Sequence, residues 1–120
     1  MPLKKAILIV EDSSAIRDLL KYSLEPEGFD LYTAENGKIA LKILNQYEID
    51  LIITDLQMPI MNGFELINHV KERGKNIPIV AITAYYNSSS EMQAISENVY
   101  RLLEKPLDLI VLTNLIKEAI

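Results

Sequence analysis

Short apolar runs along the chain alternate with longer segments in which apolar residues recur every three or four positions. Three runs are apolar almost throughout, which is typical of strands buried on both faces of a parallel sheet. They cover residues 6–10, 51–54 and 79–83. A weaker run at 100–103 predicts a further strand, and residues 29–33 alternate between polar and apolar, as an edge strand does. The pattern therefore predicts five strands.

The segments between the strands show the helical spacing of apolar residues. Their predicted buried stripes are Ile16, Leu19, Leu20 and Leu24; Ile39, Ala40, Ile43, Leu44 and Tyr47; and Phe64, Ile67 and Val70. Polar residues able to cap a helix precede each stripe, namely Ser13 or Ser14, Asn36 and Asn62. Residues 88–98 are polar and weakly patterned, which predicts a short or mobile helix, whereas 107–119 has a clear apolar stripe. One helix is thus expected after each strand.

This order of elements predicts one α/β domain that occupies residues 1–120. Strands that alternate with helices of this length are joined by right-handed crossovers, so that helices cover both faces of a parallel sheet. The expected fold class is doubly wound, with five β–α units and no internal repeat. In open sheets of this kind the functional site lies at the carboxyl ends of the strands. Residues that directly follow the apolar runs are therefore the first candidates for chemistry.

Composition excludes several classes of function. The chain has 12 Lys and Arg against 17 Asp and Glu, and its net charge of −5 disfavours direct binding to nucleic acid or to an anionic membrane. It has no cysteine, so neither a disulfide framework nor a thiolate metal site can form. No apolar run is long enough to span a bilayer, and the first residues do not resemble a signal peptide. We expect a soluble, cytoplasmic protein.

Charged and hydroxyl side chains stand where the predicted strands end. Glu11 and Asp12 follow the first strand, Asp55 follows the third, Thr83 ends the fourth, and Lys105 lies just beyond the fifth. Because the carboxyl ends of parallel strands meet at one edge, these side chains are expected to converge. Three neighbouring carboxylates repel one another and need a cation, which can be the Lys105 ammonium, a hard divalent ion or both. With no cysteine and one histidine in the chain, Mg²⁺ is the natural candidate ion.

A site of this composition is suited to phosphoryl transfer. A carboxylate beside Mg²⁺ and a lysine can attack a phosphoryl group and become an aspartyl phosphate. The two cations neutralise charge on the transferring group, while a threonine hydroxyl can donate a hydrogen bond to one of its oxygens. Each residue alone has a plainer explanation, such as a helix cap, a turn or a surface lysine. Their joint placement on one edge is what favours the functional explanation.

Four motifs, in this order and spacing, resemble the signature of response-regulator receiver domains. They are Glu11-Asp12, Asp55-Leu56-Gln57-Met58-Pro59 with Gly63, Thr83-Ala84 and Lys105-Pro106. The resemblance spans essentially the whole chain. It implies a flavodoxin-like (βα)5 three-layer sandwich, in which the five-stranded parallel sheet has the order 2-1-3-4-5.

The resemblance also implies a function in two-component signalling. A partner histidine kinase or phosphotransfer protein would pass a phosphoryl group from its phosphohistidine to Asp55. Mg²⁺ would be held by Asp12, Asp55 and the backbone carbonyl of Gln57, with Glu11 helping through water. The chain would assist this transfer and the slow loss of its own phosphoryl group, and it would not be an enzyme that acts on a separate substrate.

The switch itself is assigned by the same resemblance. Thr83 would follow the phosphoryl group, and Lys105, whose bond to Pro106 would be cis, would pair with it. Receivers often carry Tyr or Phe three residues before this lysine, and here that position is Leu102, which becomes the second candidate switch residue. We expect the output to be read mainly from movement of the loop at 83–90.

Other functions are open to comparison. The main alternative is a pseudo-receiver that docks partners without being phosphorylated. An aspartyl-phosphate phosphatase would need an acid where Gln57 stands, and the acidic Glu11-Asp12-Ser13 would repel the phosphate of a flavin. The expected downstream partner is an effector protein or an output domain of a longer chain, and the expected assembly is a monomer or a phosphorylation-linked dimer.

Overall fold

The computed structural model describes residues 4–120, so the first three residues of the predicted domain lie outside the described part. The strands are β1 (Ala6–Val10), β2 (Asp30–Ala34), β3 (Leu51–Asp55), β4 (Ile79–Thr83) and β5 (Arg101–Glu104). The helices are α1 (Ser14–Leu24), the short 3-10 helix η1 (Glu25–Glu27), α2 (Gly37–Gln46), α3 (Gly63–Glu72), α4 (Ser90–Asn98) and α5 (Leu109–Ala119). Over the described range, no helix combines the length and the apolar character that crossing a membrane requires.

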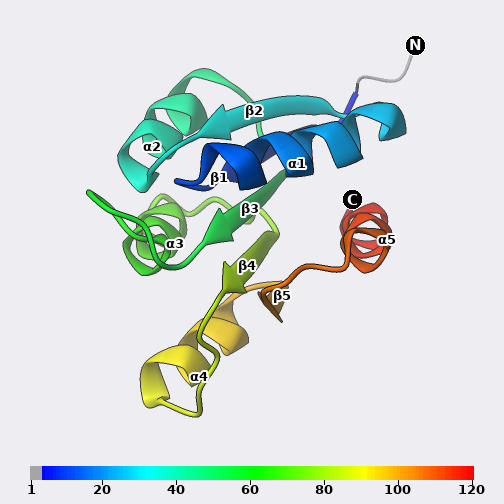
Figure 1. Cartoon of the computed structure of the whole chain (residues 1–120). Coiled ribbons are helices and arrows are strands. Elements are labelled where there is room, and N and C mark those ends of the chain that lie inside the picture. Colours follow the sequence, from blue (N-terminus) through cyan, green and yellow to red (C-terminus); the bar gives the residue numbers. More distant parts are fainter. Residues whose placement is uncertain (1–3) are drawn as a thin grey trace.

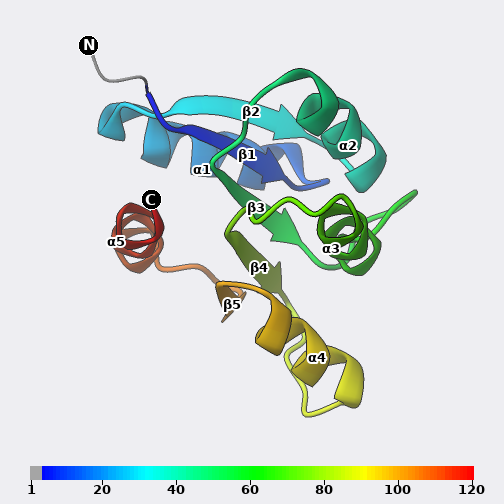
Figure 2. The ribbon, with the colours of Figure 1, turned by 180° about the vertical axis from the view of Figure 1, so that it is seen from behind.

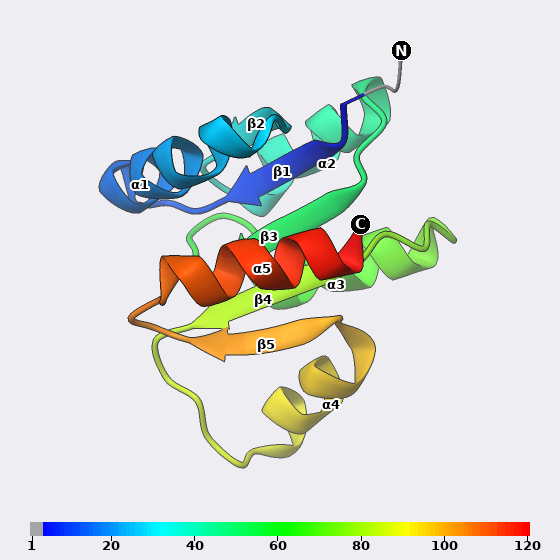
Figure 3. The same ribbon diagram turned by 90° about the vertical axis from the view of Figure 1, so that its right-hand side faces the viewer.

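The strands form one parallel sheet in the order β2-β1-β3-β4-β5, which confirms the predicted doubly wound, flavodoxin-like fold. Figures 1 and 2 show the three layers, with α1 and α5 on one face of the sheet and α2, α3 and α4 on the other. In Figure 3 the arrowheads of β1, β4 and β5 point to the same edge of the sheet. Parallel pairing sets Asp55 beside Ile82 and Thr83 beside Glu104, so the last residues of β3, β4 and β5 meet at that edge.

Two apolar cores lie between the sheet and its helices, because successive residues of a strand point to opposite faces. The side facing α1 and α5 receives Ile7, Ile9, Leu51, Ile53, Val80 and Ile82. The side facing α2, α3 and α4 receives Leu8, Val10, Ile52, Ile79 and Ala81. Each fully buried Leu or Ile contributes about 1.5–3 kcal/mol relative to exposure. Burial on both faces explains why β1, β3 and β4 are continuously apolar in the sequence.

Polar side chains fix where the helices begin. The side chain of Ser13 accepts a hydrogen bond from the backbone of Ile16, and Asn36 caps α2 in the same way. Asn62 and Glu65 bond each other's backbone at the start of α3, forming a capping box. Each such cap contributes about 1 kcal/mol. The weakly patterned segment at 88–98 forms the short helix α4, whose first turn is capped by Ser89.

Two residues of the predicted buried stripes are exposed, so their predictions were wrong. Leu19 is 51% exposed, because α1 directs Leu20 and Leu24 into the core and leaves Leu19 at its edge. Tyr47 is 46% exposed, because α2 ends one residue earlier and Tyr47 has extended backbone. Its ring packs instead against Tyr32, with the ring centroids 4.7 Å apart. Helical periodicity places residues on a face of a helix but does not show how wide the covered part of that face is.

The loop between β3 and α3 contains a strained residue. Ile60 has a φ of 71°, and its side chain is 75% exposed. The left-handed conformation costs a residue with a branched Cβ about 1–2 kcal/mol, and so exposed a side chain recovers little of this cost through burial. We expect Ile60→Gly to raise the free energy of unfolding by about 1 kcal/mol in urea denaturation. Ile60→Val keeps the branched Cβ and is the control; equal stability of the glycine variant and the parent would contradict the prediction.

Candidate functional site

Lys105 brings two carboxylates together at the carboxyl edge of the sheet. It directly follows β5, and its Nζ lies 2.9 Å from Glu11 Oε1 and 2.9 Å from Asp55 Oδ2. Its backbone N–H donates to the carbonyl oxygen of Thr83 (2.8 Å), which ties the end of β5 to the end of β4. The bond to Pro106 is cis, as the resemblance implied. Residues that are far apart in the sequence are therefore joined through one ammonium group.

Asp55 is held in a fixed orientation by its neighbours. It is 5% exposed, and its Oδ1 accepts a hydrogen bond from the backbone N–H of Gln57 (3.1 Å). The hydroxyl of Thr54 donates to the Asp55 carbonyl oxygen (2.9 Å). Gly63 lies so close that a Cβ on it would be 2.3 Å from this carbonyl oxygen. One carboxylate oxygen thus faces a backbone donor and the other faces the Lys105 ammonium.

Three carboxylates form a cluster that could hold a metal ion. Glu11, Asp12 and Asp55 each offer an oxygen, and these oxygens lie within 4.8 Å of one another. Glu11 Oε2 is buried and is the single buried side-chain oxygen or nitrogen between residues 4 and 120 that lacks a hydrogen-bond partner. A buried oxygen without a partner is costly, and a water molecule bound to a hard cation would satisfy it. The donor set contains oxygen alone, which fits Mg²⁺ and not a softer metal.

The ionisation of the buried pair follows from this arrangement. Burial, with a smaller effect of the neighbouring Asp55 carboxylate, raises the pKa of Glu11 from 4.5 to about 7, although the Lys105 ammonium acts in the opposite direction. Burial alone would lower the pKa of Lys105, but its hydrogen bonds to Glu11 and Asp55 outweigh this effect and raise it. Lys105 therefore stays charged at neutral pH, and Glu11 is the group that titrates there.

The raised pKa of Glu11 makes stability depend on pH in the absence of divalent cations. Below pH 4.5 Glu11 is protonated in both states and costs nothing; between 4.5 and about 7 the unfolded chain ionises first, so the free energy of unfolding falls as the pH rises. The loss is on the order of 3 kcal/mol. In EDTA, we expect the stability advantage of Glu11→Gln over the parent to grow by this amount between pH 4.5 and 7.5, followed by denaturant titration at each pH. A constant difference across the range would refute the prediction.

Thr83 is fully buried at the end of β4, and two groups engage its hydroxyl. Thr83 Oγ1 donates to the side-chain oxygen of Gln57 (3.1 Å) and accepts from the backbone N–H of Tyr85 (3.1 Å). Leu102, the other candidate switch residue, pairs with Ala81 in the sheet and packs partly buried on the core beneath α4. Its role in switching stays a prediction.

Arg17 belongs to the site and was missed in the sequence. Its guanidinium donates to the carbonyl oxygens of Glu11 (2.8 Å) and Asp12 (3.3 Å), so it braces the acidic loop after β1. The contact is made to backbone atoms, and no motif in the sequence distinguishes Arg17 from a solvated arginine on α1.

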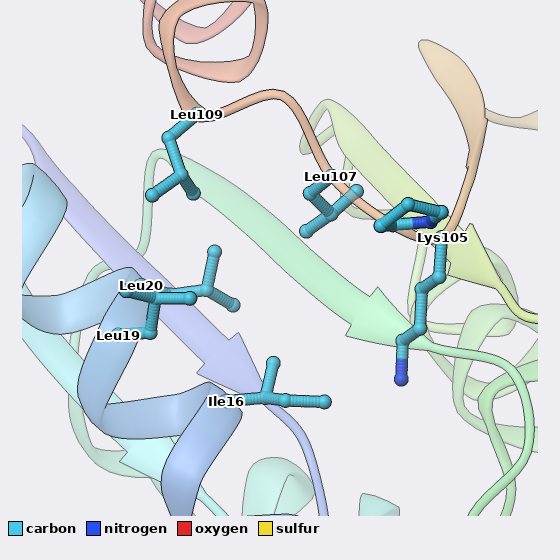
Figure 4. Close-up of a pocket in the computed structure, with 7 residues that line it drawn as sticks. Ile16, Leu19, Leu20, Lys105, Leu107 and Leu109 are labelled. Atoms are coloured by element: carbon cyan, nitrogen blue, oxygen red, sulfur yellow. The ribbon is translucent and has the colours of Figure 1, made fainter.

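An apolar groove of about 460 Å³ lies beside the site, between α1 and the loop that leads into α5. It is lined by Ile16, Leu19, Leu20, Lys105, Pro106, Leu107 and Leu109. Figure 4 shows that the Lys105 side chain extends away from Leu107, with its nitrogen at the free end. The partly exposed Leu19 is thus explained by its position at this groove.

Comparison with known proteins agrees with this geometry. Residues 7–117 match the model of the response regulator receiver domain. An uncharacterized 14.6 kDa protein of Leptolyngbya boryana is 38% identical over 114 residues, which cover 93% of this chain and 87% of that protein. The transcriptional regulatory protein GlrR of Escherichia coli (strain K12) is 32% identical over 114 residues. These cover 95% of this chain but 26% of GlrR, so the chain spans about a quarter of that relative.

A solved structure extends the comparison to three dimensions. The response regulator protein TrrA of Thermotoga maritima, determined in complex with Mg(2+)-BeF, is 34% identical and superposes with a TM-score of 0.85. The match covers 97% of this chain and 99% of that one. With the order of strands, the edge on which the carboxylates meet and the family match all in agreement, the chain belongs to the response regulator receiver domains.

Proposed function

We propose that the chain is a cytoplasmic, phosphorylation-operated switch that accepts a phosphoryl group on Asp55 from the phosphohistidine of a partner protein. One observation carries the proposal: a buried Asp55 carboxylate lies 2.9 Å from the Lys105 ammonium at the edge where Glu11 and Asp12 also gather. Membership of the receiver family supports it. A docking module that is never phosphorylated would not need a cation and three carboxylates at one strand edge.

The transfer is a displacement at phosphorus. An Asp55 oxygen forms a bond to phosphorus while the bond from phosphorus to the partner's imidazole nitrogen breaks, and that nitrogen keeps the electron pair. Lys105 neutralises charge on the phosphoryl oxygens, and the backbone N–H of Gln57 holds the carboxylate in place for attack. After transfer, the Thr83 hydroxyl donates to a phosphoryl oxygen. The chain thereby assists its own phosphorylation and acts on no separate substrate.

The acidic cluster fits Mg²⁺ on the chemistry of its donors and on the unpartnered oxygen of Glu11. Asp12, Asp55 and the backbone carbonyl of Gln57 would hold the ion, and Glu11 would reach it through water. When bound, Mg²⁺ supplies positive charge that offsets the charge of the phosphoryl oxygens. The relative TrrA, solved with Mg(2+)-BeF, supports this assignment.

The proposed partners are those that membership of the receiver family implies. The phosphoryl donor is a histidine kinase or a phosphotransfer protein. The downstream partner is an effector protein or an output domain. The matched segment covers 26% of the transcriptional regulatory protein GlrR, which is therefore long enough to hold a further domain. The switch works as a monomer or as a dimer that forms on phosphorylation.

The proposal is tested by incubating the protein with acetyl phosphate or phosphoramidate and Mg²⁺ and measuring its intact mass. We expect the mass of one phosphoryl group on the parent and none on Asp55→Asn, because Asp55 supplies the attacking oxygen. Asp30→Asn removes an exposed carboxylate at the first residue of β2, at the opposite edge of the sheet from Asp55, and should be labelled like the parent. Absence of labelling on the folded parent would instead favour the pseudo-receiver.

A further inference from the structure

We propose that the side chain of Gln57 is a positioning residue, which holds the Thr83 hydroxyl in the resting state and competes with the phosphoryl group for its proton. The inference deepens the proposed function and rests on it. In this structure Thr83 Oγ1 donates to Gln57 Oε1 over 3.1 Å. The two residues lie on neighbouring strand ends, since β3 pairs with β4 and Gln57 is two residues beyond β3.

A threonine hydroxyl carries one proton and can donate one hydrogen bond. The same oxygen also accepts a hydrogen bond, because the backbone N–H of Tyr85 donates to one lone pair of Thr83 Oγ1 over 3.1 Å. The proton has therefore two alternative acceptors, the Gln57 carbonyl oxygen and an oxygen of a phosphoryl group on Asp55. Donation to the second requires that the first bond be broken.

The Gln57 side chain can hold the Thr83 hydroxyl away from the phosphoryl group without being part of the apolar core. Its backbone N–H binds Asp55 Oδ1 and its side chain binds Thr83, so one residue links the acceptor carboxylate to the switch hydroxyl. Its side chain is exposed, whereas Thr83 is fully buried. Replacing the amide therefore removes the hydrogen bond and leaves the packing of the sheet in place.

The release of Thr83 is transmitted to the chain through Tyr85. The Tyr85 backbone follows the hydroxyl because it donates to it, and Tyr85 belongs to the loop that joins β4 to α4. Figure 3 shows this loop as a long arch beside the sheet. In the resting state the bond between Gln57 and Thr83 thus holds the start of this loop as well as the hydroxyl.

The test measures the affinity for beryllofluoride, a mimic of the phosphoryl group that is not hydrolysed, by calorimetry in excess Mg²⁺. Gln57→Met keeps the length of the side chain but has no amide oxygen, and we expect it to bind about two- to fivefold more tightly than the parent. This span corresponds to the lower half of the net range for one neutral hydrogen bond, because Gln57 is exposed. Gln93→Met, the same change at an exposed position of α4, should bind like the parent.

A double-mutant cycle separates positioning from a general effect on the site. Thr83→Val keeps the shape of the side chain without the hydroxyl, and Gln57→Met should have no further effect in its presence. The inference is overturned if Gln57→Met binds no more tightly than the parent, or if the gain is the same in the Thr83→Val background. If the folded parent binds no beryllofluoride at all, the proposed function fails together with the inference, whereas binding without a gain refutes the inference alone.

Discussion

Lys105→Met is expected to slow phosphoryl incorporation from acetyl phosphate about 100-fold. The Lys105 ammonium is the described cation nearest the reaction, lying 2.9 Å from Asp55 Oδ2 and 2.9 Å from Glu11 Oε1. Without it, the buried carboxylates of Glu11 and Asp55 lose a shared counter-charge, and an incoming anion meets more negative charge than the metal ion alone offsets. Preorganised groups of this kind contribute most where water is excluded, and Asp55 is 5% exposed.

The measurement is the initial rate of mass increase at saturating Mg²⁺. Lys117→Met is the matched control, because Lys117 also forms an ion pair, with Glu27, but on α5 and remote from the site. A rate for Lys105→Met within a factor of about three of the parent would show that the metal ion alone neutralises the charge of the transferring phosphoryl group. Far-UV circular dichroism would establish that both variants are folded.

The parallel sheet and its functional edge were predictable because both depend on short-range patterns. Strands buried on both faces must be apolar throughout, and β1, β3 and β4 are. The rule that sites lie at the carboxyl ends of parallel strands then placed Glu11, Asp55 and Thr83 on one edge. Asp55 itself closes β3, where the sequence had suggested that the strand ends one residue earlier.

The remaining features depend on which atoms happen to meet in the folded chain. The hydrogen bond between Gln57 and Thr83 joins side chains 26 residues apart, and the contact of Arg17 is made to carbonyl oxygens that every residue carries. The positive φ of Ile60 contradicts the preference of a branched residue, so local sequence argues against it. Such features are fixed by tertiary contacts and leave no periodic signal.

Gly63→Ala is expected to lower the free energy of unfolding by about 3 kcal/mol, and to slow phosphorylation as well. An added Cβ would lie 2.3 Å from the Asp55 carbonyl oxygen and 2.8 Å from Leu56 Cα. Both are backbone atoms of a fully buried segment, so neither can rotate away as the end of a side chain would. The start of α3 or the end of β3 has to shift, and a shift of β3 moves the acceptor carboxylate relative to Lys105.

Gly28→Ala distinguishes this close approach from the ordinary cost of replacing a glycine. Gly28 has a φ of 85° but nothing within 4 Å of its would-be Cβ, so the change should cost about 1 kcal/mol and leave phosphorylation unaltered. Urea denaturation and the rate of labelling by acetyl phosphate are measured on both variants. If Gly63→Ala were no less stable than Gly28→Ala, the chain would have room at Asp55 that this structure does not contain. The Gly63 contact positions the Asp55 backbone. Gly63→Ala should therefore lose both stability and phosphorylation, whereas Gly28→Ala should lose stability alone.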